Sequence, residues 1–159
     1  MTHGRKVIKY WLPVFLGMGL VFLFSTGTFS AANTSWLLGQ ILSFLIPVIS
    51  PKELAWINYT IRKLVHVLEY FILGLLLFRA FRGGSSEPFK WRWALFTLMG
   101  VLLLAAGDEV HQFFIPARAA SPVDVGIDTV GGVLAPFFGA FWYFGRVKGN
   151  PPNQRFLPD

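Results

Sequence analysis

The residues best suited to chemistry in this sequence form three short sets with helical spacing. Lys63, His66 and Glu69 recur every three residues, and Tyr70 follows directly. Because positions three and four apart are neighbours on a helix surface, such a set forms one polar stripe. The other two stripes consist of Asp108, His111 and Gln112, and of Asp124 and Asp128.

Acid–base chemistry or contact with a ligand head group is the first function these side chains suggest. His66 and Glu69 could serve as a general acid and base, with Asp108 and Glu109 beside them as further candidates. Arg118 has a planar guanidinium that suits a phosphate or a carboxylate. The structural alternative is that these charges pair with one another: Glu69 with Lys63 or Arg118, and Arg118 with Asp124 or Asp108.

A metal site is a weaker possibility. The carboxylates of Asp108, Glu109, Asp124 and Asp128 could offer oxygen ligands to a divalent cation, and two histidines could add nitrogen. No recognised ligand spacing is present, so we predict neither a metal nor a cofactor. The chain has no cysteine, which excludes thiol catalysis.

The composition places these stripes in a membrane. Hydrophobic residues make up 54% of the 159-residue chain and charged residues 14%, well below the roughly 25% of soluble domains. The net charge is +6, but the Lys and Arg residues flank apolar runs instead of forming a stripe. They therefore indicate membrane topology and contact with anionic lipids, not nucleic-acid binding.

Four apolar segments have the length of a membrane span, about 20 residues. We predict an all-α bundle with spans at about 7–24, 62–81, 91–114 and 125–144. One domain would cover 1–147, with a flexible tail at 148–159. Trp36 to Ile49 is too short for a span and predicts an interfacial or re-entrant helix, with Lys52 to Thr60 as a short lead into the second span. The first segment could instead be a cleaved signal peptide; we favour a retained helix because it is long.

The distribution of Lys and Arg gives the orientation. With four spans, the N-terminus, the loop between the second and third spans and the C-terminal flank lie on one side and carry most of the basic residues, so this side is predicted to be cytoplasmic. The polar stripes then lie in the outer half. Glu69 is the deepest, roughly 15 Å above Arg79 at 1.5 Å per residue. A charge at that depth must face the bundle, pair or be protonated.

The stripes resemble the VanZ-like membrane proteins over roughly Lys52 to Phe144. The resemblance rests on the ordered set Lys63, His66, Glu69, Tyr70, Asp108, Glu109, Gln112, Arg118, Asp124 and Gly131. It implies a multi-span protein of the bacterial cytoplasmic membrane and a link to reduced susceptibility to teicoplanin-type glycopeptides. Asp128 stands where the family pattern leads us to expect Asn, and His111 falls at an open position.

We therefore expect a binding module with an outer-facing polar pocket. Its ligand would be an amphiphile such as a lipid-linked cell-wall precursor, with membrane lipids as the other partners. The residues expected to contact the ligand are Lys63, His66, Glu69, Asp108, Gln112, Arg118, Asp124 and Asp128. An enzyme acting on a lipid-linked substrate is the alternative, and a purely structural polar seam is a third possibility.

Overall fold

The computed structural model describes residues 3–46, 48–116 and 121–149, and every regular element in these ranges is a helix. In chain order the elements are α1 (His3–Phe24), the 3-10 helix η1 (Gly27–Phe29), α2 (Ala31–Leu45), α3 (Pro51–Arg82), α4 (Trp91–Phe113) and α5 (Pro122–Gly149). The helices α1, α3, α4 and α5 are long and apolar enough to cross a membrane. The predicted all-α fold with four spans and one shorter helix is confirmed.

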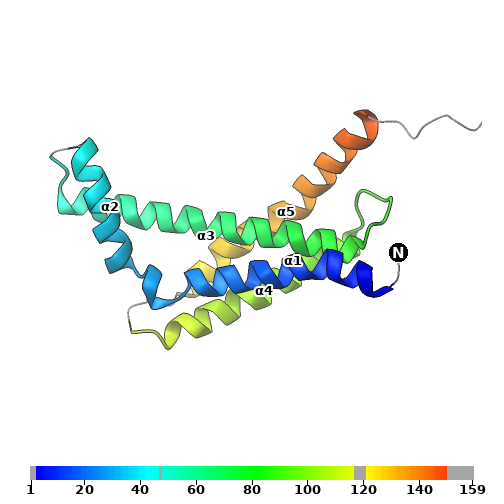
Figure 1. Ribbon diagram of the computed structural model, residues 1–159, viewed down its shortest axis with the longest axis horizontal. Helices are drawn as coiled ribbons and strands as arrows, with labels where there is room; N and C mark the ends of the chain where they lie inside the picture. The colour runs from blue at the N-terminus through cyan, green and yellow to red at the C-terminus, as the bar shows by residue number, and fades with distance from the viewer. Residues whose placement is uncertain (1–2, 47, 117–120, 150–159) are drawn as a thin grey trace, which may run out of the picture.

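The long helix α3 is the centre of the fold. It packs against α1, α4 and α5, and α2 packs against its N-terminal part (Figure 1). The start of α1, the loop between α3 and α4 and the end of α5 lie towards one end of the molecule. The turn around η1, the helix α2, the end of α4 and the start of α5 lie towards the other. The basic flanks predicted to be cytoplasmic are therefore on the same side of the bundle.

The second span begins earlier than the sequence pattern indicated. The helix α3 starts at Pro51, so the segment expected to be a separate lead is part of one helix of 32 residues. A capping box explains the start: the Ser50 side chain accepts a hydrogen bond from the Glu53 amide, and the Glu53 carboxylate accepts one from the Ser50 amide. At about 1.5 Å per residue the helix is about 48 Å long and exceeds the hydrocarbon core of about 30 Å.

Two other boundaries also differ from prediction. The short helix α2 covers Ala31–Leu45 instead of Trp36 to Ile49. The last helix runs from Pro122 to Gly149, so the first two residues of the predicted tail are helical, and the rest of that tail lies outside the described residues. The division into one domain and a tail stays a prediction.

Small residues let α3 and α5 approach each other closely. A Cβ atom added at Gly131 would lie 2.4 Å from the carbonyl oxygen of Val67 and 2.9 Å from the amide of Phe71. One added at Gly74 would lie 2.8 Å from the Cβ of Ala135. Only glycine fits at these two crossing points, and small residues of this kind let membrane helices pack closely.

Candidate functional site: a buried polar cluster beside an apolar groove

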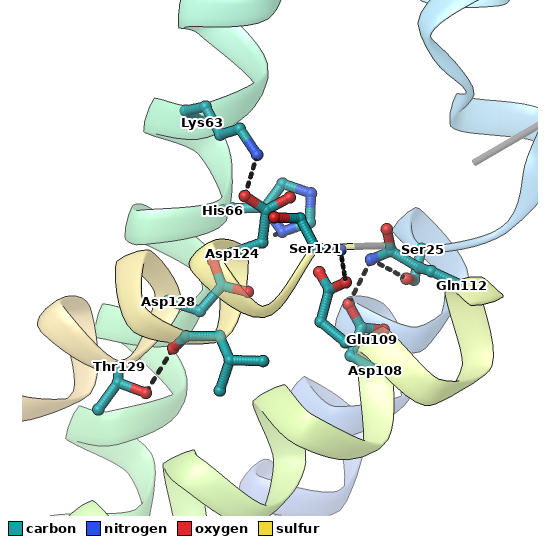
Figure 2. A network of polar contacts seen from close by, with 11 residues as sticks. Ser25, Lys63, His66, Asp108, Glu109, Gln112, Ser121, Asp124, Asp128 and Thr129 are labelled. Atoms are coloured by element: carbon teal, nitrogen blue, oxygen red, sulfur yellow. Dashed lines mark hydrogen bonds and ion pairs between the residues drawn. The ribbon is translucent and has the colours of Figure 1, made fainter. Parts of the chain in front are cut away.

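Side chains from three helices and from the connection after α1 meet near the end of the bundle that carries η1 and α2. Figure 2 shows Lys63 and His66 from α3, Asp124 and Asp128 from α5, and Asp108, Glu109 and Gln112 from α4 pointing towards a common region. Ser25, just after α1, joins them. We call Ser25, Lys63, His66, Glu69, Tyr70, Asp108, Glu109, Gln112, Asp124 and Asp128 the polar cluster. Apart from His111, the residues of the three stripes predicted from sequence therefore come together.

Two charge contacts connect α3 to α5. The ammonium of Lys63 forms an ion pair with Asp124, and both side chains are partly exposed. One turn deeper, His66 Nδ1 lies 3.7 Å from Asp128 Oδ1. The close packing at Gly131, one turn beyond Asp128, holds the two helices at the separation these contacts need. The sequence had offered Glu69 as a partner for Lys63, whereas the structure gives Asp124.

The helix α4 contributes a second set of hydrogen bonds. The amide of Gln112 donates to Asp108 Oδ2 at 2.7 Å and to Ser25 Oγ at 2.8 Å. Glu109 Oε2 accepts a hydrogen bond of 2.6 Å from the backbone amide of Ser121, just before α5. Gln112 thus ties α1 to α4, and Glu109 ties α4 to the start of α5.

His111 lies elsewhere, with its ring against Phe22 of α1 at a centroid distance of 4.1 Å. His111 therefore lies on the face of α4 that packs against α1, and not with Asp108 and Gln112 in the polar cluster. The family pattern leaves this position open, and the contact of His111 with Phe22 is apolar.

Several buried polar atoms of the cluster have no hydrogen-bond partner among the described residues. They are His66 Nδ1, the Tyr70 hydroxyl, Asp108 Oδ1, Glu109 Oε1 and both carboxylate oxygens of Asp128. Tyr70 is fully buried and Asp128 is 1% exposed. Unsatisfied buried polar groups cost roughly 1–3 kcal/mol each, more when charged, so their concentration in one place is typical of a functional site.

An apolar groove of about 300 Å³ lies between α2 and α3 and ends at the polar cluster. Leu37, Leu38 and Ile41 of α2 form one wall, and Val65 of α3 forms part of the other. The polar side chains that line it are Thr34, Asn58, Arg62, His66 and Glu69. Two members of the cluster, His66 and Glu69, are thus accessible from the groove.

Polar contacts fix α2 against α3 and so keep the groove in shape. The amide of Asn58 donates to the carbonyl of Ala31 at 3.1 Å and to Ser35 Oγ at 2.5 Å. The Arg62 guanidinium donates to the carbonyl of Phe29 at 2.6 Å. Sequence reasoning missed Asn58 and Ser25, because their partners are far along the chain and no local spacing reveals them.

The predicted anion contact Arg118 lies outside the described residues. Within the described ranges, no three His, Cys, Asp or Glu side chains come together in a group that could hold a metal ion. The described residues therefore contain no ready ligand set for the metal-assisted alternative.

The fold and the cluster define a multi-pass α-helical membrane protein with charged side chains buried between its spans. The family model described as VanZ/LLP1 matches residues 10–143, which is most of the chain. The chain belongs to the VanZ/LLP1 family, as the resemblance indicated. No curated protein and no solved structure matches it.

Proposed function

We propose that this protein binds an amphiphilic ligand of the cell envelope, with its apolar part in the groove between α2 and α3 and its head group at the polar cluster. The observation that supports this proposal is the continuity of the two features. The same helix face that lines the groove, at His66 and Glu69, also belongs to the cluster. An amphiphile needs this arrangement of an apolar channel ending at polar groups.

The proposal gives the site residues different roles. His66 and Glu69 meet the head group, and Asp108, Gln112 and Asp128 shape the region behind them. Lys63 already pairs with Asp124, so its charge is largely neutralised within the protein. Arg118 keeps its proposed role as a contact for an anionic group of the ligand.

The setting we propose is the bacterial cytoplasmic membrane, with both termini in the cytoplasm. The basic residues at the start of α1 and at the α3–α4 connection support this orientation. The cluster and the groove then face the outer leaflet, where envelope precursors and glycopeptides meet. Lower susceptibility to teicoplanin-type glycopeptides would follow if the bound amphiphile alters the target of the antibiotic.

A blocking substitution in the groove tests the proposal. Leu38→Trp places a large ring in the groove, whereas Gln40→Trp adds the same ring to an exposed position of α2 outside it. We expect Leu38→Trp to abolish retention of envelope amphiphiles by the purified protein and any effect of its expression on teicoplanin susceptibility. Gln40→Trp should leave both unchanged. Equal retention and susceptibility for both variants and the native chain, at equal expression, would refute the proposal.

A membrane enzyme acting on a lipid-linked substrate is the second candidate. The contact of the partly exposed His66 with the buried Asp128, beside carboxylate oxygens without partners, favours it, since such a pair could move a proton. Reconstituted protein should then change the mass of a lipid in an envelope extract, and His66→Gln should stop that change. Lipids that are retained but unchanged in mass support binding alone.

A further inference from the structure

The polar cluster contains more acidic than basic side chains. Five carboxylates lie in it: Glu69, Asp108, Glu109, Asp124 and Asp128. Arg62 and Lys63 are the permanently charged cations beside them in the described structure, so the formal balance is 2 − 5 = −3. A ligand head group that brings positive charge would therefore be favoured over one that brings negative charge.

The same region also contains carboxylate oxygens that lack hydrogen-bond donors. The oxygens of Asp108, Glu109 and Asp128 that have no hydrogen-bond partner are acceptors when ionised, and His66 Nδ1 comes no closer than 3.7 Å to Asp128 Oδ1. The fully buried hydroxyl of Tyr70 is also without a partner, and these carboxylates and Glu69 act on it electrostatically. A tyrosine hydroxyl can both donate and accept a hydrogen bond, so it is an observation independent of the carboxylates. The carboxylate oxygens of this region need a group that donates several hydrogen bonds.

The groove allows a head group to reach this region. Glu69 and His66 line the groove, and His66 stands next to Asp128, so the negative region begins at the groove's polar end. Arg62 lines the groove as well and uses one guanidinium nitrogen for the carbonyl of Phe29. A guanidinium has five N–H donors, so Arg62 keeps capacity for a phosphate.

We propose that the groove is selective for a phospholipid whose head group ends in a primary ammonium. This inference rests on the proposed function and specifies its ligand. The phosphate contacts Arg62, and the ammonium contacts Glu69 close to the pair formed by His66 and Asp128. The acyl chains lie along the apolar wall of α2. A primary ammonium supplies both the positive charge and the three N–H donors that the cluster lacks.

Native mass spectrometry of the purified full chain tests this with three phospholipids that have identical acyl chains. Phosphatidylethanolamine has a primary ammonium, phosphatidylcholine has a positive charge without N–H donors, and phosphatidylglycerol has no ammonium. We expect phosphatidylethanolamine to bind about tenfold more tightly than either of the others, which corresponds to about 1.4 kcal/mol. Equal affinity for all three overturns the inference and leaves the proposed function standing. If Leu38→Trp does not reduce binding of any of them, the proposed function fails too.

Substitutions then assign the preference to named side chains. Glu69→Gln and Asp128→Asn should each bring the affinities for the three lipids close together. The matched control is Glu87→Gln, which removes a carboxylate from the exposed α3–α4 connection and should preserve the preference. Arg62→Gln should lower the affinity for all three lipids by a similar factor, because all three carry the phosphate. A preference that survives in both Glu69→Gln and Asp128→Asn, with each variant eluting as the native chain does, would overturn the assignment.

Discussion

Gly131→Ala probes the packing that brings His66 and Asp128 together. The added Cβ would lie 2.4 Å from the carbonyl oxygen of Val67, where ordinary contact begins at about 3.4 Å. The shortfall is 3.4 − 2.4 = 1.0 Å, and the obstacle is backbone that cannot rotate away. The helices α3 and α5 must therefore separate by about 1 Å at this crossing.

The expected cost follows from that separation. Overpacking a well-packed interior costs about 1–3 kcal/mol, and we expect the upper end because the clash is with backbone. At about 2–4 °C per kcal/mol for a chain of this size, the midpoint of thermal unfolding in detergent should fall by about 6–12 °C. The same separation lengthens the 3.7 Å contact between His66 and Asp128, so ligand binding should weaken as well.

Gly126→Ala is the matched control on the same helix. A Cβ at Gly126 meets nothing within 4 Å, and alanine is favoured over glycine in a helix by about 1 kcal/mol. Its unfolding midpoint should be equal to or slightly above that of the native chain. If Gly131→Ala unfolds at the same temperature as Gly126→Ala, the close approach of α3 and α5 is not the feature that holds the site together.

Three further substitutions test the contacts around the site. Asn58→Ala should lower stability by about 1–3 kcal/mol and increase proteolysis in α2, because it removes the hydrogen bonds that fix this helix. In a double-mutant cycle in detergent, Lys63→Met and Asp124→Asn should show a coupling energy of about 0.5–1 kcal/mol; additive effects would mean the pair is not formed. Gln112→Leu should release α1 near Ser25, seen as faster hydrogen exchange in residues 20–30, whereas unchanged exchange would contradict the proposed tie.

The spans and the convergence of the polar stripes could be predicted from sequence because each depends on local spacing. Apolar length identifies a span, and residues three or four apart must share a face. Glu69 cannot face lipid cheaply at its depth, which directs it into the bundle. The start of α3 was missed although Ser50 and Glu53 have the spacing of a capping box, since the polar residues after Pro51 were interpreted as a separate segment.

The pairing within the cluster and the groove could not be predicted in this way. Which carboxylate meets Lys63 depends on the rotation and height of α5 relative to α3, and Gly131 sets both through a contact with Val67. The groove depends on the position of α2, which is fixed by Asn58 across 27 residues of sequence. Such contacts are properties of the packed helices, and helical periodicity carries no information about them.

Photocrosslinking tests most directly whether the groove holds an amphiphile. The protein is reconstituted with a phospholipid that carries a diazirine on its acyl chain, irradiated, and digested for mass spectrometry. We expect crosslinks to concentrate on Leu37, Ile41 and Val65, which line the groove, and to disappear from them in Leu38→Trp. Crosslinks spread evenly over lipid-facing residues such as Leu103 and Phe141, with no change in Leu38→Trp, would contradict the claim that the groove is a binding site.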